Sequence, residues 1–285
     1  MSASSQSSRP PLLLRIPAAV GAGCRALGRA ALNSSAYAGG IVRLLGEVVG
    51  RTARAMVGRG DRMRVGSLFA QCFRFGVRSI PIVILVELFI GLILVLNLSP
   101  TLASYGQLER VADVVAIAIL RELGPLLTAI LLSGFAGASI AAEIGAMVEG
   151  EEIKALRAHA LDPIRFLVVP RVIATTVMMV GLAVVADVAG ILGGLFTAVF
   201  VLDLNVQHYL EFTRAAVGPS DYFTGLTKAA VFGMTIAALA CYEGLRVRGG
   251  AEGVGRATTT TVVKCIVALI GVDSIFTAIF YVAGI

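Results

Sequence analysis

Seven ionisable residues stand inside long apolar stretches of the sequence, and they are its candidates for chemistry or binding. They are Glu87, Arg121, Glu122, Asp187, Lys228, Lys264 and Asp273. A charge in such surroundings is costly, so it normally faces a partner or a wet cavity. The sequence has no GxxxxGK[ST], HExxH or GxSxG motif, and its two histidines are far apart. We therefore predict no catalytic residue and no metal site.

The composition identifies the kind of element that must hold these charges. Of 285 residues, 57% are hydrophobic and 15% are charged, and the mean hydropathy is +0.89. An ordinary soluble domain carries about 25% charged residues, because its surface needs polar cover. The apolar runs are continuous rather than alternating, which excludes an outer-membrane barrel. The sequence predicts an all-α integral membrane protein.

Five segments reach the roughly 20 apolar residues that a membrane-spanning helix needs. We expect spans at 79–98, 111–136, 172–202, 222–245 and 258–283. Asn97 and Ser99-Pro100 should close the first, and the second should continue as helix to Met147. We therefore divide the chain into a five-span domain, 79–285, and an N-terminal segment, 1–78. Arginines recur among small and apolar residues at 12–49, which predicts amphipathic helices lying on the membrane surface.

The distribution of Lys and Arg predicts the orientation in the membrane. Residues 1–78 and the loops at 148–171 and 246–257 carry 19 of these residues, whereas the opposite side carries two. Cytoplasmic segments are the richer in Lys and Arg. The N-terminus should be cytoplasmic and the C-terminus external. The basic segment then faces anionic lipid headgroups rather than nucleic acid.

Lys228 and Asp273 come out at matching depth in the membrane. Lys228 lies six residues inside the outer end of its expected span, about 9 Å, and Asp273 lies about 22 Å above the inner end of its own. Neighbouring antiparallel helices would bring the two together, so we predict an ion pair. The alternative is that each snorkels or binds water separately. Lys264 lies close enough to the inner interface to snorkel.

Glu122 lies near mid-membrane, one turn before Pro125. Adjacent helical residues point about 100° apart, so Arg121 should not face Glu122. Glu122 therefore either has another partner or faces a wet cavity, or it serves only the structure around the proline. Glu87 and Asp187 remain without an assigned role.

The polar loop after the second span predicts a short cytoplasmic helix. Glu149, Glu151 and Glu152 should open it, because carboxylates favour the N-terminal dipole, and Asp162-Pro163 should end it. Ile153, Leu156 and Leu161 fall at helical spacing and would form its apolar face. This helix is either a plain surface helix or the element that docks on a cytoplasmic partner.

Small residues recur at four-residue spacing at the end of the second span. One stripe holds Gly137, Ala141 and Gly145, and the other holds Gly134, Ala138, Ala142 and Ala146. Small residues let helices approach closely in a membrane. We therefore expect this helix to pack tightly against protein.

Several long motifs resemble the MlaE/YrbE permease family, in order along residues 65–283. They are RELGPLLTA from Arg121, AAEIGAM from Ala141, LDPIRFLVVPR from Leu161, and GRATTTTVV from Gly255 with GVDS from Gly271. The resemblance implies the membrane subunit of an ABC system that moves phospholipid or a related lipid. It also implies a homodimer, cytoplasmic ATPase subunits that bind ATP and Mg, and a periplasmic MCE-domain protein. The loop at Glu149–Leu161, with Asp162, would be the coupling helix to the ATPase.

The sequence departs from the family pattern at three places. Phe135 follows Gly134 where the family usually has arginine, and Glu87 stands at a usually small or apolar position. The segment 157–161 has neither the Met-rich character nor the glycine that the family shows before Asp-Pro. The last departure suggests contacts adjusted to this chain's own ATPase.

We therefore expect a five-span permease in a bacterial cytoplasmic membrane that binds no cofactor itself. Glu122, Lys228 and Asp273 would form its intramembrane charge network or substrate pocket. Two alternatives are a proton-coupled secondary lipid carrier and a non-transporting scaffold for an MCE protein.

Overall fold

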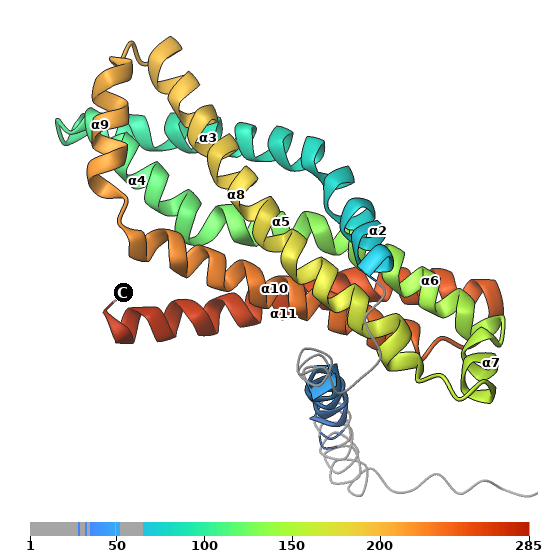
Figure 1. Ribbon diagram of the computed structural model, residues 1–285. Coiled ribbons are helices and arrows are strands. Elements are labelled where there is room, and N and C mark those ends of the chain that lie inside the picture. The colour runs from blue at the N-terminus through green and yellow to red at the C-terminus, as the bar shows by residue number, and fades with distance from the viewer. Residues whose placement is uncertain (1–27, 29–31, 33–34, 49, 52–64, 285) are drawn as a thin grey trace, which may run out of the picture. The chain divides into compact units, whose positions relative to one another are not determined.

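The computed structural model describes residues 28, 32, 35–48, 50–51 and 65–284, and within them it contains helices and no strands (Figure 1). The chain divides into two compact units, 1–46 and 47–285. Of the amphipathic helices expected at 12–49, residues 28, 32 and 35–48 are helical, and the others lie outside the described residues. The second unit holds the bundle.

Five helical segments of the second unit are long and apolar enough to cross a membrane, as predicted. They are Leu68–Ser104, Leu108–Glu149, Ile164–Phe200, Pro219–Gly244 and Gly250–Ala283. Each of the five begins earlier in the sequence than the span that we expected there. Figure 1 shows α9 and the C-terminus at one end of this unit and α7 at the other.

The spans are built from the following elements. The first contains α2 (Val65–Phe75), the 3₁₀ turn Val77–Ser79 and α3 (Ile80–Ser104); the second contains the 3₁₀ turn Leu108–Arg110, α4 (Val111–Ala118), α5 (Gly124–Leu132) and α6 (Ala138–Glu149); the third ends in α8 (Val169–Phe200); the fourth is α10 (Pro219–Gly244) and the fifth α11 (Gly250–Ala283). Outside them, α7 (Glu152–Ala158) joins spans two and three, and α9 (Val206–Ala216) joins spans three and four.

The first span does not end at Ser99-Pro100 as expected, because its helix continues through Pro100 to Ser104. Proline removes the N–H that would bond the carbonyl of Leu96, four residues earlier. The Ser99 hydroxyl donates to that same carbonyl at 3.3 Å. The local hydroxyl replaces the lost donor, so the helix persists.

The second span contains two π-helical turns, Ile119–Leu123 and Ser133–Gly137. After the first of them, the Gly124 N–H bonds the Ile119 carbonyl five residues back, and Pro125 has no N–H to offer. Such turns inside α-helices occur frequently at functional sites. The helix next to Pro125 therefore contains a widened turn, and this turn carries Arg121 and Glu122.

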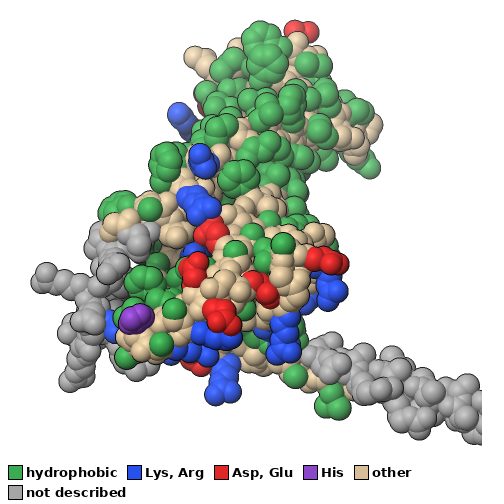
Figure 2. Space-filling model, turned by 90° about the vertical axis from the view of Figure 1, so that its right-hand side faces the viewer, with side chains coloured by type: hydrophobic (Ala, Val, Ile, Leu, Met, Phe, Trp, Pro, Cys, Tyr) green, Lys and Arg blue, Asp and Glu red, His purple; other side chains and the backbone are tan. Residues whose placement is uncertain are grey.

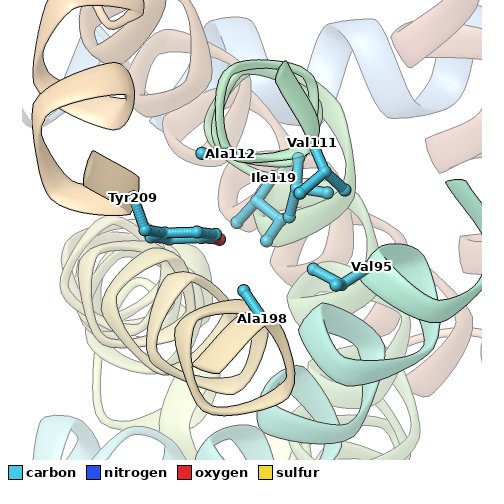
Figure 3. Packing of buried hydrophobic residues seen from close by; sticks show 7 residues of the cluster. Val95, Val111, Ala112, Ile119, Ala198 and Tyr209 are labelled. Atoms are coloured by element: carbon cyan, nitrogen blue, oxygen red, sulfur yellow. The ribbon is translucent and has the colours of Figure 1, made fainter. Parts of the chain in front are cut away.

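At the α9 end, a buried apolar cluster joins α9 to three spans. Tyr209 of α9 is 2% exposed and points toward Val95, Val111, Ile119 and Ala198 (Figure 3). Its large ring fills the space between α3, the second span and α8. This packing fixes the loop between spans three and four against the bundle.

Candidate functional site

Lys228 of α10 lies at the centre of a charged cluster that joins three spans. Its Nζ donates to Glu122 Oε2 at 2.5 Å and lies 2.9 Å from Asp273 Oδ1. It also donates to the Thr277 hydroxyl at 2.9 Å, which in turn donates to Glu122 Oε1 at 2.9 Å. The predicted pairing of Lys228 with Asp273 is confirmed, and Glu122 has a partner in Lys228, which is one of the alternatives left open for it.

The burial of this Lys228 cluster is uneven. The Lys228 side chain is 1% exposed, Asp273 15% and Glu122 36%. Two carboxyl groups and a hydroxyl surround the one ammonium, which donates hydrogen bonds to Glu122 and Thr277 and forms an ion pair with Asp273. Thr277 was missed in the sequence, although it lies one turn after Asp273 on the same helical face.

Arg121 pairs with Asp221 of α10 and not with the adjacent Glu122, as the helical geometry predicted. Asp221 also accepts the Gly218 N–H at 2.8 Å and so caps the start of α10. The sequence assigned Asp221 to a loop, which concealed this partner. The π-turn of span two is thus held to α10 by two ion pairs, through Asp221 and Lys228.

Gly225 of α10 permits the close approach of α10 to this π-turn. A Cβ on Gly225 would overlap the carbonyl oxygen of Leu120. Because only glycine fits there, the α10 backbone can lie directly against the turn that carries Glu122.

A second buried acidic pair lies on the other side of span two. Glu87 of α3 is fully buried and Asp187 of α8 is 4% exposed. The Thr128 hydroxyl of α5 donates to Glu87 Oε1 at 3.5 Å. In the described part of the chain, no ion pair joins either carboxyl to a cation.

The helix expected over the 149–161 loop is shorter than predicted. Helix α7 begins at Glu152 and ends at Ala158, because Gly150 ends α6 and Glu151 adopts a left-handed conformation with φ of 59°. Glu149 therefore belongs to α6, where its Oε2 accepts the Gly250 N–H at 2.9 Å. Glu151 precedes the helix, and the Lys154 ammonium bonded to it at 2.6 Å lowers the pKa of its carboxyl.

The apolar face predicted for this helix is only partly present. Ile153 is 7% exposed and Leu156 is half-buried. Leu161 is not on α7: it follows a turn with positive φ at Ala160 and is 47% exposed. Asp162 also follows α7, and its Oδ1 accepts the Ile164 N–H at the start of span three.

Charged side chains gather over the end of the bundle that carries α6 and α7 (Figure 2). Exposed residues there are Glu149, Glu151, Glu152, Lys154, Arg157, Arg248, Glu252 and Arg256. This end therefore presents a polar surface suited to an aqueous partner.

A network that was not predicted from the sequence ties spans one, two and three together. Glu143 of α6 bonds Arg171 of α8 at 3.0 Å and Arg74 of α2 at 2.6 Å. Lys264 pairs with Glu243 at 2.8 Å instead of only snorkelling. Glu143 and Arg171 both lie in the quoted motifs, but their distance in sequence gave no sign of pairing.

The two small-residue stripes of span two have different surroundings. Gly137, Ala141 and Gly145 face the protein, and a Cβ on Gly145 would lie 2.8 Å from Val247. Gly134 is exposed and would have no atom within 4 Å of a Cβ among the described residues. Only the first stripe packs inside the described chain.

Comparisons with known proteins match this bundle. The family described as Permease MlaE matches residues 68–279, from the start of the first candidate span into the last. A probable ABC transporter permease protein of Rickettsia felis is 37% identical over 214 residues, 75% of this chain and 83% of the relative. The intermembrane phospholipid transport system permease protein MlaE of Haemophilus influenzae is 33% identical over 232 residues, 81% of this chain and 89% of the relative. The chloroplastic protein TRIGALACTOSYLDIACYLGLYCEROL 1 of Arabidopsis thaliana is 29% identical, over 74% of this chain and 60% of the relative.

Proposed function

This chain belongs to the MlaE permease family, and from that premise we propose that it moves phospholipid or a related lipid as the membrane subunit of an ABC transporter. The observation that carries the proposal is the family match across the five candidate spans. The name of the Haemophilus relative, a phospholipid transport permease, supports the substrate class. A periplasmic MCE-domain protein would exchange lipid with this subunit.

We propose that α7 is the docking element for a cytoplasmic ATPase that binds ATP and Mg. Its position at the charged end of the bundle supports this role, as does its direct connection to span two (Figure 2). Closure of the ATPases would push α7 and move span two. Span two would bend at its π-turns, because helices kink at such turns. The chain itself would hydrolyse nothing.

The Lys228 cluster would transmit this movement, because it ties span two to spans four and five. Lys228 is buried and already bonded to Glu122, Asp273 and Thr277, so it has little charge left for a phosphate headgroup. We therefore propose a mechanical role rather than an anion site. The partly exposed Glu122 is the member of the cluster that a moving lipid could reach.

We propose a homodimer, with the exposed face of span two around Gly134 directed toward the second copy. Small residues on that face, including Ala138 and Ala142, would permit close helix contact. Span two would then move against its dimer mate and expel lipid from an outward-facing pocket.

The proposed orientation in a bacterial cytoplasmic membrane places α7 in the cytoplasm and α9 and the C-terminus in the periplasm. Single cysteines at 212 and 252, in a chain freed of its four native cysteines, would test it with an impermeant thiol reagent. Position 212 should react from outside and position 252 only from inside. External labelling at 252 would overturn the orientation.

Reconstitution tests the transport proposal against its two alternatives. The permease with its ATPase subunits, in vesicles that contain labelled phospholipid, should transfer lipid to an MCE acceptor only when ATP is hydrolysed. Transfer driven by a pH gradient without ATP would instead indicate a secondary carrier. Acceptor binding without lipid movement would indicate a scaffold.

A substitution on α7 tests the docking proposal separately. Leu156→Asp should release the ATPase subunits from the purified complex while the permease stays inserted, since an unpaired charge would enter the docking surface. Leu156→Met, which keeps an apolar side chain of similar size, is the matched control. Wild-type ATPase yield with Leu156→Asp would show that docking lies elsewhere.

A further inference from the structure

Glu87 and Asp187 meet where three helices converge, away from the Lys228 cluster. Glu87 comes from α3, Asp187 from α8, and Thr128 from α5. Glu87 and Thr128 are fully buried and Asp187 is 4% exposed. Asp187 is 18 residues from the start of α8 and 13 from its end, so the site is deep within the span.

The crossing of α3 and α8 brings the two carboxyls to one level. These helices run in the same direction, toward the α9 end (Figure 1). Their backbones touch at glycines, since a Cβ on Gly91 would overlap the carbonyl of Gly190. Glu87 lies one turn before Gly91, and Asp187 lies three residues before Gly190, so both side chains project from the same side of the crossing.

Helix α5 closes the site. A Cβ on Gly124 would overlap Asp187 Oδ1, so this glycine makes the room for the carboxyl. Thr128, one turn later, bonds Glu87 at 3.5 Å. Gly124 and Thr128 are one turn apart on α5, so the two carboxyls lie against neighbouring positions of the same helix.

The site lacks the donors that two carboxylates would need. Glu87 Oε2 and Asp187 Oδ1 have no hydrogen-bond partner in the described part of the chain. Of the groups contributed by the three helices, only Glu87 and Asp187 are titratable, because α5 contributes a threonine. The nearest charges of the π-turn, Arg121 and Glu122, bond to Asp221 and Lys228 of α10. A buried carboxylate without a cation or donors is strongly disfavoured, whereas a protonated carboxyl supplies its own O–H.

We propose that Glu87 and Asp187 form a proton-binding site inside the membrane. At neutral pH the carboxyls hold protons, so the site contains O–H donors of its own beside the oxygens that have no other partner. The site links α3, α5 and α8 without any net charge. It lies on the side of span two opposite the Lys228 cluster.

Infrared spectroscopy of the purified full-length permease, in a detergent without ester groups, tests the proposal. The wild-type protein at pH 7 should show the carbonyl band of protonated carboxylic acids, and this band should decrease in Glu87→Gln and in Asp187→Asn. Glu143→Gln is the matched control, because Glu143 is bonded to two arginines and should not contribute. An unchanged spectrum in both variants would overturn the proposal.

The pH dependence of stability gives a second measurement. An unfolded chain releases these protons near pH 4, whereas the folded pair retains them, so the folded state binds more protons and loses stability as pH rises. The unfolding temperature should fall between about pH 5 and 8 in the wild type, and less in Glu87→Gln. Equal slopes would contradict the proposal, as would a sodium-dependent rise in stability that Glu87→Gln abolishes, which would identify a cation site. Because an amide mimics a protonated carboxyl, failure of both amide variants to fold would also contradict it.

Discussion

The two buried acidic sites lie on opposite sides of span two, and they differ in what surrounds them. On the α10 side, Glu122 and Asp273 bond to Lys228, and Thr277 completes the network. On the α3 and α8 side, Glu87 and Asp187 lie against α5, with one threonine hydroxyl and no paired cation in the described part of the chain. The same kinds of side chain, in the same helix bundle, thus have opposite electrostatic surroundings.

This difference indicates how each acid can be tolerated in a membrane. A carboxylate next to an ammonium has its charge compensated, and the loss of one partner leaves the other uncompensated. A carboxyl pair without a cation has to be neutral, so an amide can replace either member. Substitutions that remove charge should therefore be harmful on one side of span two and mild on the other.

The largest effect should come from Lys228→Met, which leaves Glu122 and Asp273 facing each other. Removal of one partner from a buried ion pair costs about 3–5 kcal/mol. We expect a large fall in unfolding temperature and loss of ATP-driven lipid transfer. Lys228→Met with Asp273→Asn should be milder than the sum of the two, and addition of Glu122→Gln should recover most of the stability. Strict additivity would show that the three residues do not interact.

A smaller effect should follow Gly91→Leu, which forces α3 away from α8 at the Glu87 site. Overpacking of a close contact costs about 1–3 kcal/mol, and here the obstacle is backbone that cannot rotate away. Gly181→Leu is the matched control, because Gly181 of α8 is exposed and a Cβ there would meet no atom of the described residues within 4 Å. The unfolding temperature of the permease should fall for the first and hold for the second. An equal fall for both would show that the close contact between α3 and α8 at Gly91 has no special effect on stability.

Thr277→Val should have a lesser effect on the Lys228 cluster, because it removes a hydroxyl and no charge. Hydrogen bonds to charged groups contribute about 1.5–3 kcal/mol, and those of the exposed Thr277 should lie at the lower end of this range. Ser274→Ala provides the control, since the Ser274 hydroxyl bonds only the carbonyl of Ile270 in its own helix. Comparison of their unfolding temperatures would separate the cluster from general changes in α11. A larger loss for Ser274→Ala would contradict the assigned role of Thr277.

The smallest effect should be that of Glu87→Gln at neutral pH, at the lower end of the roughly 0.5–3 kcal/mol that single substitutions cost, because the amide replaces a neutral carboxyl of the same shape. Glu122→Gln should cost more, about 1.5–3 kcal/mol, because it weakens a hydrogen bond to a charged group. Thermal unfolding of both variants at one pH measures the difference directly. If Glu87→Gln proves the more destabilising, the two sites are not distinguished by charge.

Matching depth on antiparallel helices was enough to predict the Lys228–Asp273 pair from sequence. The same arithmetic did not find Thr277 or Asp221, because both are polar residues that occur at many positions without a buried role. The charged network of Glu143, Arg171 and Arg74 was also missed, since nothing in the spacing of these residues links them. Along the 149–161 loop, periodicity overestimated α7, because left-handed residues at 151 and 160 interrupt the helical pattern.

The sequence by itself determined the membrane class, the number of spans and the placement of charges within them, because these follow from hydropathy over about 20 residues. It also carried the motifs that mark the MlaE family. Only the tertiary structure decided which acids have a cation. That outcome depends on how each helix is rotated about its axis, and the glycine contacts at Gly91 and Gly225 set those rotations through backbone packing that no local pattern specifies.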